Sequence, residues 1–436
     1  MNSKGGFRRW IPLAETIALL AALVLFVQVA VRSEADSPGF DLAPLAAGGK
    51  LVATGGRAHL YAHDPLHYNR TSDPVFDRAV RETGFPYGST PFVYPPLVAW
   101  LMRPVAAVPF ARVMAAWTWL SLLFLVLTIR LVFATYLPRA NRPLSWAVVL
   151  AALTVFEPVR YGFWLGQTTS VIVLLVLLAL WLARRGRPGA GVALGIAAFV
   201  KLTPALFALI WLWRGPRRAF AAFAATLLAL GGLSLATMGP ALQVEYLARL
   251  RHISGVALIA YNNHSLPAFL ARLTVDPATP LASWFERPMP GWVAAATAAV
   301  ALAMGAAAVM AARRIPVADD ARWRPPLEGM AFLLILLAPS LSWTHYFVYL
   351  LPVAAIAAAA GGWRVAPFAA AALALCCRPL IPTQYTFRPA DWQIISSPTL
   401  AALAFGALLL AVLVRAGVSN PWKGRGRKFP ILGRSA

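Results

Sequence analysis

Long runs of apolar residues separated by short polar segments dominate the chain and predict membrane-spanning helices. The first run, Ile11–Val31, is long enough to cross a membrane, which takes about 20 apolar residues. Lys4, Arg8 and Arg9 precede it and no convincing small-residue cleavage site follows, so we expect a retained signal anchor with its N-terminus inside. Further apolar runs occupy residues 111–133, 145–157, 166–183, 190–200, 202–213, 219–238, 291–312, 328–342, 346–360, 366–380 and 399–415.

Several of these runs are too short to cross the membrane alone. The clearest case lies between Arg187 and Arg214, where both ends are basic and therefore expected in the cytoplasm. A hairpin of two short helices that breaks at Lys201-Leu202-Thr203-Pro204 satisfies both the charge and the length. Interrupted helices are tolerated at membrane depth where they line a protein cavity. The pattern predicts an all-α, polytopic membrane protein with about twelve membrane segments and both termini in the cytoplasm.

The composition agrees with the apolar pattern and excludes other classes of protein. Hydrophobic residues make up 60% of the 436 residues and charged residues 13%, whereas soluble domains are near 45–50% apolar and about 25% charged. The same apolar content excludes a disordered chain. The two cysteines, Cys376 and Cys377, are adjacent in an apolar run, which excludes a disulfide scaffold.

The net charge of +23 indicates orientation in the membrane and no nucleic-acid partner. Most Lys and Arg residues fall in the segments assigned to the cytoplasm, which contain only three acids when Glu328, just beyond residue 324, is counted with Asp319 and Asp320. Those segments are the N-terminus, residues 130–142, 184–187, 214–218 and 313–324, Arg364, and the tail from Arg415. The chain is then one membrane domain over residues 1–415, followed by a basic tail, 416–436, that contacts anionic membrane lipids. The large extracytoplasmic segments are Arg32–Pro96, Gly239–Gly291 and Ile381–Pro398.

Two ionisable residues are candidates for chemistry because of where they lie. Lys201 is at membrane depth at the break of the short hairpin, where a cation is costly and a phosphate would be a suitable partner. The alternative is a lysine that snorkels to the interface. Asp41 follows the first membrane segment by about ten residues, between Phe40 and Leu42, where a carboxylate with a raised pKa could deprotonate a hydroxyl. Most other acids of that segment are expected to be ordinary solvated charges.

Three further motifs lie at segment junctions. Tyr94-Pro95-Pro96 predicts a rigid turn that re-enters the membrane. In Ser342-Trp343-Thr344-His345-Tyr346, His345 is either a satisfied interface histidine or a hydrogen-bond partner for a phosphate or a sugar. In Tyr261-Asn262-Asn263-His264-Ser265-Leu266, the amides suit sugar hydroxyls, and the alternative is a helix start capped by Asn or Ser.

Signals for metals and nucleotides are weak or absent in the sequence. His59, His63 and His67 have the i, i+4, i+8 spacing of one helix face, but Pro65 interrupts that helix and favours turns over a zinc site. There is no Walker A motif and no GxGxxG sequence after a strand. We therefore expect no metal, no cofactor and no directly bound nucleotide.

Taken in order, these motifs resemble glycosyltransferase family 87, a set of polytopic, mannosyltransferase-like proteins of the GT-C superfamily. The matching motifs are the Asp41 region, Tyr94-Pro95-Pro96-Leu97, Gly166-Gln167-Thr168-Thr169, the stretch from Ala190-Gly191 to Lys201-Leu202-Thr203-Pro204, Asn262-Asn263-His264-Ser265-Leu266 and Ser342-Trp343-Thr344-His345-Tyr346. They span residues 35–360, and their order is more specific than any single motif.

The resemblance implies a GT-C fold and inverting transfer of a hexose, often mannose, from a polyprenyl-phosphate carrier to a lipid or glycan acceptor. Transfer would occur without a required metal on the extracytoplasmic face of a bacterial plasma membrane. By this resemblance Asp41 is the general base and Lys201 and His345 stabilise the departing lipid phosphate. The substrate cavity would be lined by further polar residues, namely Tyr94, Gln167, Asn262, Asn263 and His264.

Two positions depart from the family pattern. Leu42-Ala43-Pro44-Leu45 stands where the family usually carries an aromatic residue after the aspartate, which leaves Asp36 as an alternative base. Thr169 stands where an asparagine commonly follows the Gly-Gln pair, so donor or acceptor preference can differ. The alternative function is a transporter or flippase of lipid-linked sugars, which broken helices also suit. Transporters usually have two related halves, and the long first loop has no counterpart in the second half.

Overall fold

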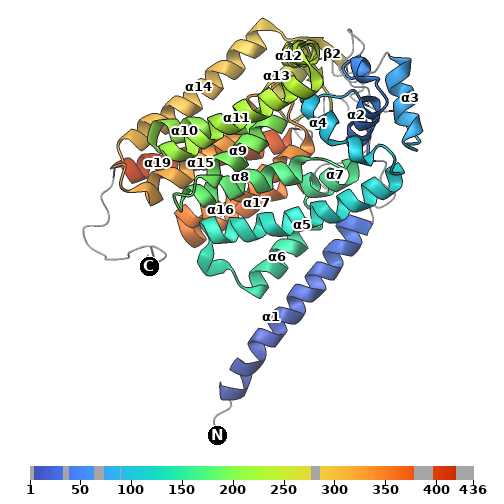
Figure 1. Cartoon of the computed structure of the whole chain (residues 1–436). Coiled ribbons are helices and arrows are strands. Elements are labelled where there is room, and N and C mark those ends of the chain that lie inside the picture. Colours follow the sequence, from blue (N-terminus) through green and yellow to red (C-terminus); the bar gives the residue numbers. More distant parts are fainter. Residues whose placement is uncertain are drawn as a thin grey trace.

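The computed structural model describes residues 4–32, 39–62, 73–88, 90–275, 285–377 and 396–418, and its regular elements are almost entirely helical (Figure 1). The α-helices are α1 (Lys4–Phe26), α2 (Ala43–Ala53), α3 (Pro74–Glu82), α4 (Pro96–Leu101), α5 (Phe110–Tyr136), α6 (Pro143–Leu153), α7 (Glu157–Leu165), α8 (Thr169–Ala183), α9 (Gly189–Val200), α10 (Leu206–Arg214), α11 (Arg217–Met238), α12 (Pro240–Ser254), α13 (Leu266–Arg272), α14 (Gly291–Arg313), α15 (Asp320–Leu337), α16 (Leu350–Gly361), α17 (Ala366–Ala374) and α19 (Ser397–Val418).

Shorter elements connect these helices. A π-helix, η1 (Val27–Arg32), extends α1, and the 3-10 turns are η2 (Arg57–His59), η3 (Arg103–Val105), η4 (Pro138–Ala140), η5 (Thr203–Ala205), η6 (Thr344–Tyr349) and η7 (Gly362–Arg364). Strands β1 (Val256–Ile259) and β2 (Phe285–Pro288) pair antiparallel, with Val256 opposite Pro288. Apart from this pair, the described fold confirms the prediction of an all-α protein.

Six helical segments of the described chain are long and apolar enough to cross a membrane. They are Pro12–Val29, Phe110–Tyr136, Arg217–Met238, Gly291–Arg313, Thr344–Gly361 and Ser397–Ala416. Other predicted segments form helices that are too short to cross alone: α6 has 11 residues and α9 has 12, which at 1.5 Å per residue is less than about 20 Å. The protein is therefore an all-α, multi-pass membrane protein, with six helices of spanning length where the apolar runs predicted about twelve segments.

The predicted break between two short helices is confirmed. α9 ends at Val200, Lys201 adopts an extended conformation, and η5 carries Pro204 before α10 begins. A side chain at Gly191, near the start of α9, would lie 2.1 Å from the carbonyl oxygen of Ala219, near the start of α11. The first turns of α9 and α11 therefore lie at the same level, so α10 returns the chain as the second arm of a hairpin. Small residues at this contact let the helix backbones approach closely.

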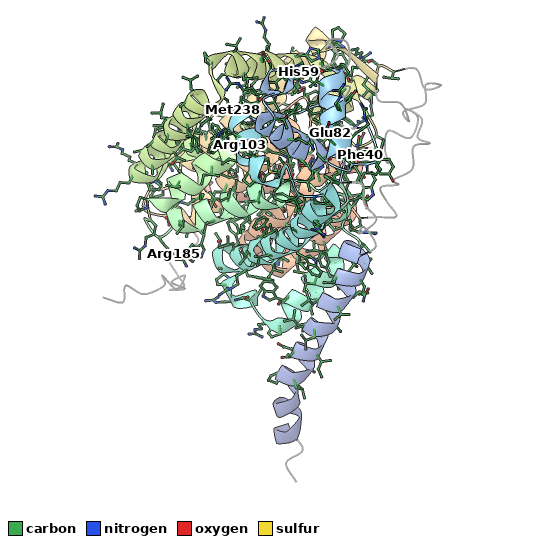
Figure 2. All side chains as sticks on the ribbon, turned by 45° about the vertical axis from the view of Figure 1, so that its right-hand side comes forward. Phe40, His59, Glu82, Arg103, Arg185 and Met238 are labelled. Carbon is green, nitrogen blue, oxygen red and sulfur yellow. The ribbon has the colours of Figure 1, made fainter. Side chains whose placement is uncertain are left out.

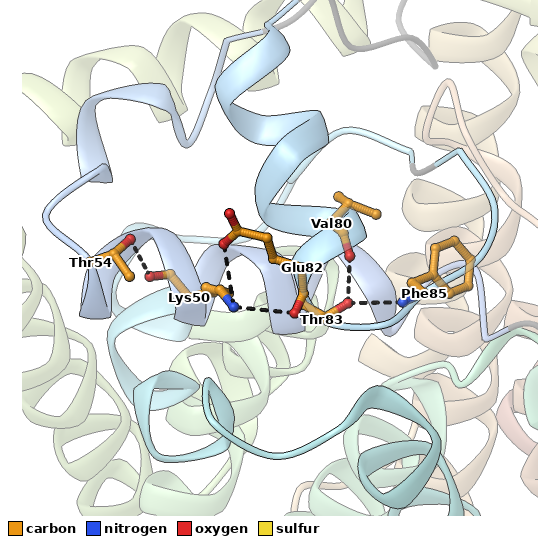
Figure 3. Close-up of polar contacts among 6 residues, drawn as sticks. All are labelled: Lys50, Thr54, Val80, Glu82, Thr83 and Phe85. Carbon is orange, nitrogen blue, oxygen red and sulfur yellow. Dashed lines mark hydrogen bonds and ion pairs between the residues drawn. The ribbon is translucent and has the colours of Figure 1, made fainter.

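The segment after α1 forms its own cap on the helical bundle. Apolar residues of α2, α3 and α4 pack together with Phe110 and Met114 of α5 in a core separate from that of the long helices. Lys50 of α2 pairs with Glu82 of α3, with 3.4 Å between Nζ and Oε2, and also donates to the Glu82 carbonyl (Figure 3). Figure 1 shows this cap at the end of the molecule where α12 and α13 also lie.

A buried ion pair joins three helices elsewhere in the bundle. Arg184, at the end of α8, donates to the carboxylate of Glu328 in α15, which is 2% exposed. Tyr136, at the end of α5, donates to the same carboxylate at 2.9 Å. The charge pattern places Arg184 and Glu328 on the same side of the membrane, as their contact requires. Figure 2 shows Arg185 far from Phe40, His59 and Glu82, which belong to the cap and its junction with the bundle.

Candidate active site

The turn between α7 and α8 brings Asp41 and Lys201 into one network. Gly166 ends α7 in the left-handed conformation (φ 66°), and a side chain there would lie 2.9 Å from Cβ of Leu42. Leu42 and its neighbour Asp41 can therefore approach the turn, and the Asp41 N–H donates to the Leu165 carbonyl at 2.9 Å. The next residue, Gln167, donates through Nε2 to Oδ2 of Asp41.

Lys201 reaches the same turn from the break after α9. Its Nζ donates to Oγ1 of Thr169 at 3.2 Å and to Oε1 of Gln167 at 3.4 Å. The ammonium also lies 4.2 Å from the ring centroid of Tyr346, which is a favourable cation–π distance. With these contacts the Lys201 side chain points into the protein, toward the glutamine that holds Asp41. A lysine that snorkels would instead extend to the membrane surface.

Asp41 has the properties of a base that works near neutral pH. Burial raises the pKa of its carboxyl from 3.8 to about 6, although the Gln167 hydrogen bond and the charge of Lys201 act in the opposite direction. A carboxylate with this pKa is ionised at pH 7 and binds a proton more strongly than a solvated aspartate. Asp36, the alternative from the sequence, lies outside the described residues.

His345 precedes Tyr346, whose ring the Lys201 ammonium contacts, and it has an unusual hydrogen-bonding state. It belongs to η6, is 1% exposed, and its ring stacks with Tyr161 at a centroid distance of 6.3 Å. Within the described part of the chain, neither of its ring nitrogens has a hydrogen-bond partner. The side chain lines a cavity of about 40 Å³ together with Gln167 and Thr169. Buried polar nitrogens are usually satisfied, so those of His345 are available to a ligand or to water.

Tyr94 supports the site from the cap. α4 begins at Pro96 with Pro95 as its N-cap, and Tyr94 directly precedes this helix start. The Tyr94 hydroxyl lies 3.2 Å from Oγ1 of Thr168, and its carbonyl accepts from Tyr61 at 2.5 Å. Because Thr168 follows Gln167, Tyr94 connects the cap to the turn that holds Asp41.

The asparagine motif after β1 divides into one residue near the site and two that belong to the framework. Asn262 donates through Nδ2 to the hydroxyl of Tyr161, at 3.0 Å, whose ring stacks on His345. Asn263 is fully buried and uses its whole amide within the protein. Nδ2 donates to the carbonyls of Leu258 and Ser340, and Oδ1 accepts from the N–H groups of Ser265 and Ser342.

His264 is likewise buried and contacts Thr344 through Nε2 at 3.0 Å. Ser265 accepts from the Ala268 N–H and caps α13, which is the helix-cap alternative that the sequence offered. Asn263 and His264 therefore tie the β1 segment to η6, which positions His345. The expectation that the Asn263 amide lines the substrate cavity does not fit its four internal hydrogen bonds.

Three residues that the sequence did not assign to the substrate site contact Lys201 or His345, although Thr169 was noted as a departure from the family pattern. Thr169 accepts from Lys201, Tyr346 lies against the Lys201 ammonium, and Tyr161 stacks on His345. Tyr346 belongs to a motif that drew attention only for its histidine. Tyr161 and Trp164, whose rings stack at 5.6 Å, are three residues apart on α7, a spacing that would have placed both on one helix face.

No metal site is formed by the described residues, since no group of three or more His, Cys, Asp or Glu side chains gathers in them. His63 and His67 lie outside those residues. His59 instead contacts Asp73, with 2.6 Å between Nδ1 and Oδ2. Cys376 is buried, and burial of the thiol is unfavourable for its thiolate form.

Comparison with known proteins adds a family to this geometry. The profile of glycosyltransferase family 87 matches residues 92–339, which is more than half of the chain. The match includes Tyr94, Gln167, Lys201 and the Asn262 motif, and it does not reach Asp41 or His345. No solved structure matches.

Curated relatives are similar over most of their length. A polyprenol-phosphate-mannose-dependent alpha-(1-2)-phosphatidylinositol mannoside mannosyltransferase of Mycolicibacterium smegmatis is 32% identical over 285 residues, covering 62% of each chain. The protein of the same description from Mycobacterium tuberculosis is 29% identical over 352 residues, covering 76% of this chain and 77% of the relative. A pentamannoside mannosyltransferase of Mycobacterium tuberculosis, also polyprenol-phosphate-mannose-dependent, is 29% identical over 60% of this chain and 57% of its own length. The chain thus spans less than two thirds of the length of two of these three relatives.

Proposed function

The chain belongs to glycosyltransferase family 87, and we propose that it transfers the hexose mannose from a polyprenyl-phosphate carrier to a lipid or glycan acceptor. The relatives described above are named for a polyprenol-phosphate-mannose donor and a phosphatidylinositol mannoside acceptor, which supports this donor class. A donor held by a lipid chain reaches its enzyme within the membrane. That route suits a multi-pass protein whose sequence carries no nucleotide-binding motif.

The observation that carries the proposal is the meeting of Asp41 and Lys201 on the two sides of Gln167. A glycosyl transfer from a phosphate needs a base for the acceptor hydroxyl and a cation for the leaving group. These two groups come from segments far apart in the sequence: Asp41 lies in the turn before α2, and Lys201 follows the end of α9. His345 precedes Tyr346, whose ring the Lys201 ammonium contacts, and both of its ring nitrogens are available as hydrogen-bonding groups.

In the proposed mechanism Asp41 removes the proton from the acceptor hydroxyl. The acceptor oxygen then attacks the anomeric carbon from the face opposite the phosphate, so the configuration inverts. The bond from that carbon to the phosphate oxygen breaks, and the electron pair leaves with the polyprenyl phosphate. Lys201 and His345 stabilise the added negative charge on the phosphate. The proton on Asp41 passes to solvent, which restores the carboxylate for the next cycle.

We further propose that the reaction takes place on the extracytoplasmic face of a bacterial plasma membrane. The basic residues in the first turns of α1 and the basic segments that end α8, α10 and α14 favour the cytoplasm, which leaves the cap with Asp41 outside. In this arrangement both termini are cytoplasmic, and short helices such as α6, α9 and α10 complete about twelve membrane segments. A tag at the C-terminus that was accessible from outside intact cells would contradict this orientation.

Transfer by the purified protein tests the proposed function. The protein in liposomes is incubated with polyprenyl-phosphate-mannose and a membrane lipid extract, and products are identified by mass spectrometry. Wild-type protein should add one hexose to an acceptor, and Asp41→Asn should lower the rate by about 10²–10⁴-fold. Asp77→Asn is the matched control, because it removes an acid of the same cap in the first turn of α3. Transbilayer movement of the donor without any glycosylated product would instead support a flippase.

A further inference from the structure

Gln167 contacts both of the groups to which the proposed mechanism gives opposite tasks. Its Nε2 donates to Oδ2 of Asp41, and its Oε1 accepts from Nζ of Lys201 at 3.4 Å. The side chain is buried, since the residue is 7% exposed. The amide is thus a link between the carboxylate and the ammonium, rather than a group that faces only the cavity.

The chemistry of the two partners fixes the orientation of this amide. An ionised carboxylate only accepts hydrogen bonds and an ammonium only donates them. The amide nitrogen must therefore face Asp41 and the amide oxygen must face Lys201. Rotation of the amide toward a bound sugar would break both contacts at once.

The backbone of Gln167 is held as firmly as its side chain. Its N–H donates to the Gly162 carbonyl at 3.0 Å, and its carbonyl accepts from Nε1 of Trp117 at 3.3 Å. Gly166, directly before it, has the left-handed conformation that sets the direction of the turn. The amide therefore starts from a fixed point between α7 and α8 and reaches two segments that approach from elsewhere.

We propose that Gln167 is a positioning residue, whose amide holds the Asp41 carboxylate and the Lys201 ammonium apart while fixing both. A direct ion pair between them would occupy the carboxylate oxygens that take the proton and the N–H groups that meet the phosphate. With the amide between them, Gln167 engages one carboxylate oxygen of Asp41, and Lys201 keeps its charge directed toward the ring of Tyr346 and the neighbourhood of His345. This inference rests on the proposed function.

The pH profile of transfer separates this role from a contact with the sugar. Among the described residues, Lys201 is the ionisable group whose charge acts on Asp41, and the same charge also acts on His345. Gln167→Glu keeps the size of the side chain but places a second carboxylate against Asp41, and like charges raise the pH at which a proton is lost. We expect the acidic limb of the kcat profile to move up by at least about one pH unit.

Gln167→Ala gives an independent measurement. Loss of the link should lower kcat by about tenfold to a hundredfold, because a misplaced base is costly, while KM for the polyprenyl-phosphate donor stays within about threefold. Gln243→Ala, which removes an amide hydrogen-bonded to Ser234 and Gly239, is the control and should retain wild-type kcat. If Gln167→Glu does not fold, Gln167→Asn replaces it, since its shorter amide cannot reach both partners and should reproduce the fall in kcat.

Two results would overturn the proposal. One is a donor KM raised about tenfold or more in Gln167→Ala with an unchanged kcat, which means that Gln167 binds the donor. The other is a pH profile of Gln167→Glu that coincides with that of the wild type. Asp41→Asn is measured in the same assay. If Asp41→Asn retains activity, the proposed base is wrong, whereas an inactive Asp41→Asn with an unmoved Gln167→Glu profile refutes only the role of Gln167.

Discussion

Replacing Lys201 by methionine should shift the acidic limb of the pH–rate profile to higher pH. In the wild type, burial raises the pKa of Asp41 to about 6, and the charge of Lys201 keeps it from rising further. As the proposed base, Asp41 can act only when it is ionised. The wild-type rate should therefore be half its maximum near pH 6 and fall about tenfold for each further pH unit below about 5. Methionine has a similar length and no charge, so it removes the electrostatic contribution with little change in volume.

The size of the shift follows from the bridged geometry. With the Gln167 amide between the two charges, a separation of roughly 6–8 Å at an effective dielectric constant of about 20 corresponds to about 2 kcal/mol, or one to two pH units. The midpoint of the limb should therefore move from about 6 to between about 7 and 8. The sign is fixed, because loss of a nearby positive charge always favours the protonated, neutral carboxyl.

The assay measures transfer to an acceptor at saturating donor from about pH 4.5 to 9, a range that covers the midpoints expected for the wild type and for Lys201→Met. Rates are normalised to the maximum of each protein. Normalisation separates the shift from any loss of rate caused by weaker phosphate binding. Lys50→Met is the matched control, because Lys50 pairs with Glu82 in the cap and its loss should leave the limb in place. A Lys201→Met profile that falls in rate but keeps the wild-type midpoint would refute the coupling between Lys201 and Asp41.

Three further predictions concern the framework. Gly191→Ala should destabilise the protein by about 1–3 kcal/mol in thermal unfolding in detergent, because its new methyl group meets the backbone of α11. Gly231→Ala is the control, because it has open space around it and should be neutral or stabilising. Equal effects of the two changes would contradict the close contact at Gly191. Glu328→Gln should cost about 3 kcal/mol by leaving Arg184 without its buried partner, and an unchanged unfolding temperature would show that the pair contributes nothing. Asn263→Ala should cost about 2–4 kcal/mol and leave donor KM within about threefold, so a raised KM at unchanged stability would restore Asn263 as a ligand contact.

Much of the architecture follows from the chain alone because membrane insertion depends on local properties. Apolar length and the placement of Lys and Arg act segment by segment, so an all-α, multi-pass protein with a break at Lys201–Pro204 could be predicted without a structure. The sequence predicted about twelve membrane segments, but six helices of the described chain are long enough to span the membrane. α9 ends at the break before Pro204, and its start packs in close backbone contact with α11 through Gly191.

Some residues of the candidate site could be chosen from the sequence, whereas the roles of others depend on the structure. Asp41, Lys201 and His345 could be chosen from the sequence because ionisable groups near or within a membrane are costly and need a partner. The sequence could not distinguish the roles of Asn262 and Asn263, since adjacent identical residues differ only in what surrounds them. The structure satisfies every hydrogen bond of the Asn263 amide and directs Asn262 to Tyr161.

The sequence by itself determined the class of the protein and the candidate residues for its site, because composition, apolar length and charge placement need no information about distant contacts. Only the tertiary structure decided that Gln167 lies between Asp41 and Lys201. Those three residues come from three separate segments, and their meeting depends on the left-handed turn at Gly166, the close approach of Leu42 and the break after α9. A network assembled across the chain is a property of packing, and no periodicity within a single segment encodes it.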